Sequence, residues 1–179
     1  MTDEPIQIVI LHTLSDGLES SSRHMIRRRA SIPAASSDIL HVGRGFGSTA
    51  VARDLIEALP FLYHEFVVLD DEWAGDIDPY PIVRKFRDLG VQALMAVAPR
   101  DRDPGRSRTC IEGRLVVRHA GDLDNRLANC LYLGVTVFRR TLIESYAHPG
   151  RVIDIARVRA ETIARREMGA CVVAQSLAN

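Results

Sequence analysis

The sequence predicts an α/β protein with a parallel core, because short apolar runs typical of strands alternate with helical segments along the chain. The connections between these segments are short, and no internal repeat or low-complexity region interrupts the 179 residues. We therefore expect a single domain over residues 1–179.

The first expected unit is a strand followed by a helix. Residues 6–11 form a β-branched apolar run between turn-tolerant residues, which is typical of a buried strand. Ser15 and Asp16 can cap the helix that follows. The arginines at 27–29 end it with the positive charge that the helix dipole favours.

The second expected unit contains a glycine-rich turn. Residues 38–42 have the pattern of a strand, residues 43–49 that of the turn, and residues 50–59 that of a helix which Pro60 stops. Another strand is expected at 65–69, where the sequence runs E-F-V-V-L.

Acidic residues mark the start of the next helix. Asp76 and Asp78 are suited to a helix start, because Pro79 fits a first helical turn. This helix is expected to run to about residue 90, and a strand is expected at 91–98.

The second half of the chain combines a hairpin with further strands and helices. Two short apolar runs flank Glu112, Gly113 and Arg114, which predicts a hairpin over residues 108–118. The remaining expected elements are strands at 131–138 and 170–174 and helices at 139–146 and 152–168.

Charge and composition weigh against several classes of function. The 23 basic and 23 acidic residues cancel and the sequence pI is about 7.0, so the general attraction to nucleic acids and anionic membranes is missing. No apolar run approaches the ~20 residues that span a bilayer, and residues 1–5 lack the layout of a secretory signal. We therefore expect a cytoplasmic protein that binds neither nucleic acid nor membrane.

The cysteines and the single lysine limit the available chemistry. Cys110, Cys130 and Cys171 are odd in number and far apart, so neither a disulfide framework nor a zinc site is expected. Lys85 is the only lysine among the 23 basic residues. Any mechanism that needs a lysine must use Lys85 or replace the ammonium group with a guanidinium, which behaves differently.

The glycine-rich turn is the first candidate binding site. Gly43, Gly45 and Gly47 lie between an expected strand and an expected helix, where backbone N–H groups can hold a phosphate. The pattern resembles, imperfectly, the Rossmann fingerprint, and Asp70 follows at about the distance of a ribose-binding carboxylate. A flexible connection explains the same glycines equally well.

Three consecutive carboxylates are the second candidate site. Asp70, Asp71 and Glu72 follow an expected parallel strand, where hard oxygen ligands suit Mg²⁺ that bridges phosphates. Helix capping or plain solvent exposure is the alternative interpretation. The six histidines show no H-x-x-x-H spacing and no serine lies in a G-x-S-x-G turn, so a metallohydrolase or serine hydrolase has no support.

Taken in order, residues 46–146 carry a string of segments that resembles the nucleotidyltransferase family that activates sugar 1-phosphates. Gly47, Ser48 and Thr49 look like the family's Gly-Thr-Ala segment, which implies contact with the nucleotide. The strand at 65–69 with Asp70 and Asp71 looks like the family's strand ending in Gly-Asp, which implies that Asp71, together with Asp70, binds Mg²⁺. The resemblance implies a GT-A-like fold with a mixed, mostly parallel sheet and helices on both faces.

The same resemblance covers a sugar-binding segment. Asn129 and the stretch from Gly134 through Thr136 to Phe138 look like the family's Asn, Gly and "Y-V-F" strand, with Thr136 in place of the usual aromatic residue. The resemblance therefore implies that Asn129, Gly134 and Thr136 contact the sugar.

Several family motifs are missing. The chain has neither the family's G-x-G-T-R loop nor its Pro-Lys-Pro motif, and residues 119–121 contain no Glu or Lys where a second family lysine is expected. The resemblance thus implies an N-terminally trimmed relative without the catalytic lysines, in which residues 6–11 match the family's second strand. Phosphoryl transfer depends on positioning and electrostatic stabilisation, so these losses should cost many orders of magnitude in rate.

Three functions remain open on this basis. The first is a divergent enzyme that binds a nucleotide or nucleotide sugar with Mg²⁺ and transfers a nucleotidyl group to a sugar 1-phosphate. The second is a non-catalytic relative that acts in regulation or assembly, with a second copy or a family member as partner. The third is a Rossmann-type binder of a nucleotide or S-adenosylmethionine. It needs the strand at 38–42 in the centre of the sheet, whereas the resemblance makes 6–11 and 66–69 neighbouring core strands.

Overall fold

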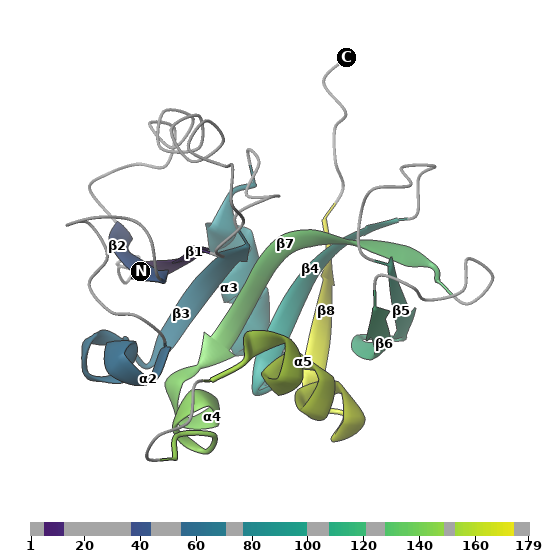
Figure 1. Ribbon diagram of the computed structural model, residues 1–179. Coiled ribbons are helices and arrows are strands. Elements are labelled where there is room, and N and C mark those ends of the chain that lie inside the picture. Colours follow the sequence, from purple (N-terminus) through teal and green to yellow (C-terminus); the bar gives the residue numbers. More distant parts are fainter. Residues whose placement is uncertain are drawn as a thin grey trace, which may run out of the picture.

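A computed structural model describes residues 6–12, 37–43, 55–70, 77–99, 108–120, 128–148 and 153–173 (Figure 1). Within them, eight strands form one sheet in the order β2-β1-β3-β7-β4-β8-β6-β5. The strands are β1 (Ile6–His12), β2 (Ser37–Gly43), β3 (Glu65–Asp70), β4 (Ala93–Pro99), β5 (Arg108–Glu112), β6 (Leu115–Ala120), β7 (Cys130–Arg139) and β8 (Met168–Val172). The helices are α2 (Leu55–Ala58), the 3₁₀ turn η3 (Leu59–Phe61), α3 (Pro79–Leu89), α4 (Arg140–Glu144) and α5 (Ile155–Ala164).

The sheet is mixed. In the described part three pairings are parallel, namely β1–β2, β1–β3 and β4–β8. Five are antiparallel, namely β3–β7, β4–β7, β5–β6, β5–β7 and β6–β8. The predicted α/β class and mixed sheet are confirmed. The expectation of a mostly parallel sheet is not, because β7 runs antiparallel between β3 and β4 and the β5–β6 hairpin adds further antiparallel pairs.

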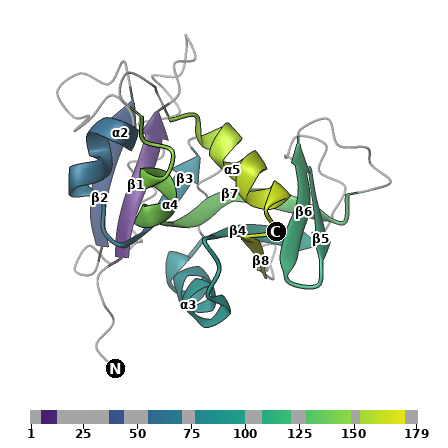
Figure 2. The same ribbon diagram turned by 90° about the horizontal axis from the view of Figure 1, so that it is seen from below.

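One end of the sheet closes on itself. β5 pairs with β6 and also with the start of β7, where Thr109 lies opposite Cys130. β6 in turn pairs with β8. The strands β7, β4, β8, β6 and β5 therefore form a small closed barrel beside the open part of the sheet, and Figure 2 shows the hairpin turned out of the sheet at this end.

Apolar side chains are buried on both faces of the sheet, and helices cover each face (Figure 2). One core contains Phe66, Phe138 and residues of α2, α4 and α5. The other contains Ile8, Val137 and the buried side of α3. The predicted placement of helices on both faces is therefore confirmed.

Helix α3 is defined by its two ends. Asp78 is the N-cap, and its Oδ1 accepts a hydrogen bond of 3.0 Å from the backbone N–H of Tyr80, as expected for an aspartate before a Pro at the first helical position. Gly90 ends the helix in the left-handed region, with φ +63°, a conformation that glycine adopts without strain. Both ends agree with the sequence prediction.

The region after α4 differs from the prediction. The helix expected at 152–168 ends at Ala164, and the next strand begins at Met168 rather than at residue 170. Arg166 has φ +60°, which no helix can continue. The apolar Met168 fits a helical spacing, but its side chain is fully buried in the sheet as the first residue of β8.

The position of β2 rules against the Rossmann alternative. That alternative needs residues 38–42 in the centre of the sheet, but β2 is the last strand at its end of the described sheet. β1 lies between β2 and β3, so residues 6–11 and 66–69 are neighbours, as the nucleotidyltransferase resemblance implies.

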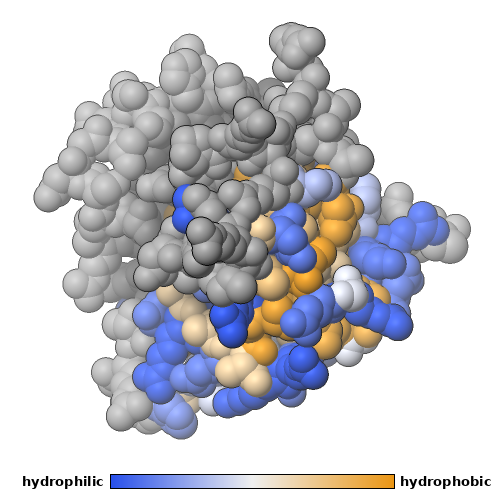
Figure 3. All heavy atoms as spheres, turned by 90° about the vertical axis from the view of Figure 1, so that its right-hand side faces the viewer, coloured by the Kyte–Doolittle hydropathy of each residue, from blue (hydrophilic) through white to orange (hydrophobic). Residues whose placement is uncertain are grey.

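The surface of the described part carries both apolar and hydrophilic side chains. On the face at the right-hand side of Figure 1, Figure 3 shows an apolar area bordered by hydrophilic side chains. Among the described residues Phe61, Tyr63 and Val172 are large apolar side chains with substantial exposure. No described helix has the length and apolar character needed to cross a membrane.

Gly169 of β8 allows close packing against its neighbours, and we predict that Gly169→Ala destabilises the fold. An added Cβ would lie 2.8 Å from Leu94 Cδ1 and 3.2 Å from Val91 Cγ2. The expected loss in the free energy of unfolding is about 1–3 kcal/mol, measured by urea denaturation. In a Leu94→Ala background the same substitution should cost less, because the closest atom is gone. An equal cost in both backgrounds would contradict this account.

Candidate functional site

Several strands end at one edge of the sheet. β1, β2 and β3 are parallel, and in their register Leu11 lies opposite Asp70 and His12 opposite Gly43. The antiparallel β7 begins at the same edge, opposite Pro99 at the end of β4. Ligands of open α/β sheets bind outside the carboxyl ends of parallel strands. This edge, which we call the carboxyl edge, is therefore the candidate site.

The nucleotide and metal residues predicted from the sequence belong to segments that leave this edge. Four of them lie outside the described residues: Gly47, Ser48, Thr49 and Asp71. Their segments follow Gly43, the last residue of β2, and Asp70, the last residue of β3. These two strand ends lie on either side of β1, which places their backbones roughly 10 Å apart at ordinary strand spacing.

Gly134 is brought next to Asp70. The register of β3 with β7 ends with Leu69 opposite Val135, so Asp70 and Gly134 are the next residues along the two strands. Gly134 has φ +77°, a conformation that favours glycine. Of the sugar residues predicted from the sequence, Gly134 thus lies beside the end of β3.

Asn129 connects the hairpin to the start of β7. Its backbone N–H donates to the carbonyl oxygen of Thr109 at 3.2 Å. Its side-chain Oδ1 accepts from the N–H of Ile111, and its Nδ2 donates to the Ile111 carbonyl, both at 2.9 Å. Asn129 is exposed, and an amide side chain has two donors and two lone pairs, so capacity for a ligand remains.

Thr136 is fully buried. Its Oγ1 lies 2.8 Å from the hydroxyl oxygen of Tyr132, and Arg159 Nη2 donates to the same oxygen at 2.9 Å. The predicted contact of Thr136 with a sugar stays a prediction, since in this arrangement the hydroxyl is bonded to Tyr132. The structure does not bring Thr136 to the surface of the carboxyl edge.

Sequence reasoning missed Tyr132, Arg159 and His119. The Tyr132 ring meets the His119 ring edge to face at 5.1 Å, and the Arg159 guanidinium lies 5.2 Å from the Tyr132 ring centroid. Arg159 is buried with Val158 and Thr162 on α5, a position that the sequence offers no reason to expect for an arginine. Tyr132 had no detectable signal either, since residues four apart on a regular strand are about 13 Å apart.

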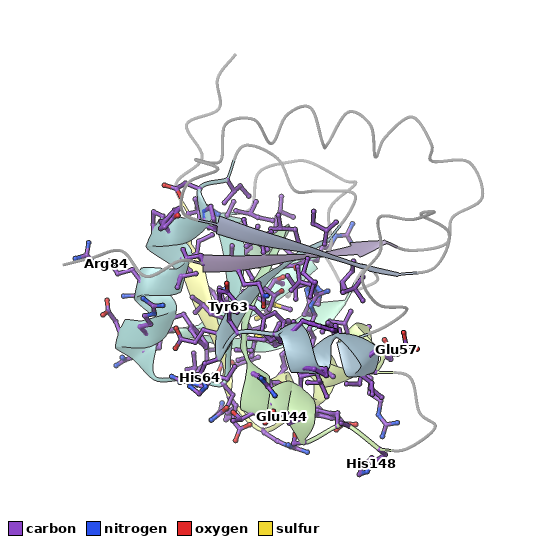
Figure 4. All side chains as sticks on the ribbon, turned by 90° about the vertical axis from the view of Figure 1, so that its left-hand side faces the viewer. Glu57, Tyr63, His64, Arg84, Glu144 and His148 are labelled. Atoms are coloured by element: carbon purple, nitrogen blue, oxygen red, sulfur yellow. The ribbon has the colours of Figure 1, made fainter. Side chains whose placement is uncertain are left out.

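Other titratable groups lie away from the carboxyl edge. His64 precedes β3 and Glu144 ends α4, and Figure 4 shows both near the opposite, lower end of the molecule, with His148. Within the described ranges, no three His, Cys, Asp or Glu side chains are grouped closely enough to hold a metal ion. The carboxylates of residues 70–72 are outside that comparison.

Cys130, the first residue of β7, is not an activated nucleophile. Burial raises the pKa of its thiol above the ordinary value, and the nearby Cys110 raises it further. Less thiolate than usual is therefore present near neutral pH, and the thiolate is the reactive form.

We predict that Cys130 in the folded protein reacts slowly with iodoacetamide at pH 8, because that pH lies further below its raised pKa than for an ordinary cysteine. The rate should increase as the pH rises toward the raised pKa. Peptide mass spectrometry of protein labelled with and without urea measures it. Equal labelling rates at pH 8 in the two conditions would show that the thiol is not protected.

Asn129→Ala should loosen the hairpin. It removes both hydrogen bonds to Ile111, at about 1 kcal/mol for each bond. Amide hydrogen exchange at Ile111 should accelerate, and the free energy of unfolding should fall by about 1–2 kcal/mol. Asn129→Asp keeps the acceptor and should lose less. Unchanged exchange at Ile111 in the alanine variant would mean that Asn129 does not hold β5.

Comparison with known proteins finds similarity at the level of structure. No protein-family model matches the sequence, and comparison with curated proteins gives no match. Solved structures do match. One is described as a glucose-1-phosphate thymidylyltransferase from Bacillus anthracis, with a TM-score of 0.66 and 14% identity over 94% of this chain and 87% of that chain.

Two further matches have related descriptions. A CMP:2-keto-3-deoxy-manno-octonic acid synthetase complexed with CTP matches with a TM-score of 0.62 and 12% identity, over 96% of this chain and 90% of that one. An inositol-1-phosphate CTP transferase from T. maritima matches with a TM-score of 0.58 and 10% identity, over 93% and 84%.

These likenesses establish the fold. The chain shares the fold of these solved structures, which agrees with the fold that the sequence resemblance implied. The matches cover 84% to 90% of those chains and lend no support to the expected N-terminal trimming.

Proposed function

We propose that this protein binds a nucleotide or nucleotide sugar together with Mg²⁺ at the carboxyl edge and acts as a divergent nucleotidyltransferase on a sugar 1-phosphate. The observation that carries the proposal is the end of β3. This strand ends with Asp70 at the carboxyl edge of a nucleotidyltransferase fold, and two further carboxylates follow it in the sequence.

The donor set fits Mg²⁺. Asp70, Asp71 and Glu72 offer only hard carboxylate oxygens. Asp70 is the last residue of β3, at the edge where α/β sheets bind ligands, and the other two follow it in the sequence. We assign Asp71 and Asp70 as the residues that hold the ion. A Mg²⁺ ion held by these carboxylates would supply positive charge beside the phosphate groups of a bound nucleotide.

The remaining assignments divide the edge into two sides. Gly47, Ser48 and Thr49 are proposed to contact the nucleotide, since their segment follows β2 at this edge and leads toward α2. Asn129 and Gly134 are proposed for the sugar side. Asn129 keeps one amide N–H and one lone pair for a hydroxyl group, whereas Gly134 is buried and would act on the sugar side through the shape of β7 next to the end of β3.

A second candidate function is binding without transfer, in regulation or assembly with a partner. The observation that favours it is the position of Lys85, the only lysine of the chain, which is exposed on α3 rather than located at the carboxyl edge. A permanently charged basic side chain at the carboxyl edge must therefore be an arginine, whose planar guanidinium group is not equivalent to an ammonium. The partner in this case is a second copy or another chain of the same fold.

A thermal-shift screen tests the proposal. The probes are CTP, UTP, dTTP and nucleotide sugars, each with and without Mg²⁺. A ligand at about 100 times its Kd stabilises by about 2.7 kcal/mol, so a bound nucleotide raises Tm measurably. We expect a shift that depends on Mg²⁺. Turnover with a sugar 1-phosphate then separates transfer from binding alone. No shift with any probe contradicts the proposed function and favours a protein that acts in assembly with a partner.

Asp71→Asn should abolish the Mg²⁺-dependent shift with little change in the stability of the free protein, because it replaces a charged oxygen ligand with a neutral amide of the same size. Asp88→Asn, at an exposed position on α3, is the matched control and should behave as wild type. Unchanged Mg²⁺-dependent binding in the Asp71 variant would remove this residue from the site.

A further inference from the structure

β7 contains extra residues at the point where it passes the carboxyl edge. Met95 of β4 lies opposite Thr136, but Val97 lies opposite Tyr132, so two steps along β4 correspond to four along β7. Gly134, with φ +77°, is in the middle of this stretch. The extra residues form a β-bulge, which bends a strand and redirects its side chains.

A chain of side-chain hydrogen bonds closes over this bulge. Tyr132 Oη lies 2.8 Å from Thr136 Oγ1, and Arg159 Nη2 donates to Tyr132 Oη at 2.9 Å. A guanidinium group can only donate, so the Tyr132 oxygen accepts from Arg159, while either hydroxyl group can be the donor in the bond between Tyr132 and Thr136. We call Arg159, Tyr132 and Thr136 the β7 clip.

The bulge and the clip depend on each other. On a regular strand, residues four apart are about 13 Å apart along the chain, too far for their hydroxyl groups to bond side by side. The 2.8 Å bond between Tyr132 and Thr136 therefore exists only in the bulged form. This hydrogen bond joins the residues on either side of Gly134, and it therefore opposes the straightening of β7 into a regular strand.

Burial makes the hydrogen bonds of the clip costly to break. Thr136 is 0% exposed, Tyr132 4% and Arg159 7%. In such surroundings a hydroxyl group that loses its partner bears the full cost of desolvation. The guanidinium of Arg159 also lies over the face of the Tyr132 ring, which fixes the ring from the side of α5. Alternative shapes of β7 would leave these polar atoms unsatisfied.

The bulge lies between the proposed metal and sugar residues. On one side Gly134 is the neighbour of Asp70 beyond the Leu69–Val135 pair. On the other side β7 starts directly after Asn129, which holds the hairpin. The shape of the bulge therefore sets where the end of β3 lies relative to Asn129.

We propose that Arg159, Tyr132 and Thr136 are positioning residues, whose hydrogen-bonded clip holds the β7 bulge in the shape that places Gly134 beside Asp70 for binding of a divalent cation. The inference rests on the proposed function, because it assumes that Asp70 and Asp71 hold the cation. The three side chains act through the backbone of β7 and do not themselves bind the cation.

Tyr132→Phe and Thr136→Val each remove one hydroxyl group of the clip while they keep the shape of the side chain. Thr162→Val is the matched control. Thr162 is also fully buried in the same layer, and its Oγ1 donates to the Val158 carbonyl at 2.6 Å within α5, away from the bulge. All three variants are expected to lower Tm.

Two measurements separate a positioning role from a general loss of stability. The first is amide hydrogen exchange at Gly134 and Asp70 in the ligand-free protein. It should accelerate in both clip variants and remain as in wild type in Thr162→Val. The second is the affinity for Mn²⁺ alone, followed by its EPR signal. It should fall roughly 3- to 30-fold in the clip variants and stay unchanged in the control.

The double variant Tyr132→Phe with Thr136→Val checks the shared bond. Each single change breaks the same hydrogen bond between Tyr132 and Thr136. The affinity of the double variant for Mn²⁺ should therefore be only slightly lower than that of Tyr132→Phe alone. Fully additive losses would show that the two hydroxyl groups act separately, which contradicts the clip.

The outcomes distinguish this inference from the proposed function. If the clip variants and Thr162→Val change exchange and affinity to the same extent, or if exchange at Gly134 is unchanged, the clip is only part of the core and the inference is wrong. If the wild-type protein binds no Mn²⁺, the proposed metal site fails. Exchange at Gly134 and Asp70 then still decides whether the clip shapes the bulge.

Discussion

The structure depends on the antiparallel placement of β7. This strand pairs with β3 and β4 along its length and with β5 at its start, so it belongs to the open sheet and to the small barrel at once. One regular strand cannot satisfy both, because the barrel requires the chain to bend away from β3. The bulge at Gly134 provides the bend, and the left-handed conformation it needs is one that glycine adopts without strain.

The position of β7 also defines the candidate site. By separating β3 from β4 it leaves the end of β3 facing the bulge rather than another parallel strand. Asn129 then fixes the hairpin against the first residues of β7. The carboxyl edge is therefore bounded by the strand end that carries Asp70, by a glycine backbone and by an amide with free hydrogen-bonding capacity.

Local chemistry made much of the fold predictable. The apolar runs of β1 and β3 bury nearly every side chain, and Asp78 and Gly90 mark the ends of α3 as capping rules require. The turn at Gly113, with φ +61°, agrees with the predicted hairpin. The shared edge of β1, β2 and β3 follows from their parallel register, which the alternation of strands and helices indicated.

Features that depend on distant partners were not predictable in this way. The strand at 131–138 was foreseen, but its direction between β3 and β4 follows from pairings with residues far away in the sequence. The burial of Thr136 depends on the bulge, which places it against Tyr132 and Arg159. A sequence resemblance could align Thr136 with a sugar-binding position but could not reveal that its hydroxyl is already bonded.

The most direct test of the account is to locate a bound metal–nucleotide complex on the sheet. Paramagnetic broadening of backbone amide NMR signals by Mn²⁺ with CTP or dTTP reports distance from the ion. We predict strong broadening at Gly43, Asp70 and Gly134 and little at Glu65 and Ala93, where β3 and β4 begin at the opposite edge. Selective broadening at Glu65 and Ala93, or none at any site, would contradict a nucleotide site at the carboxyl edge.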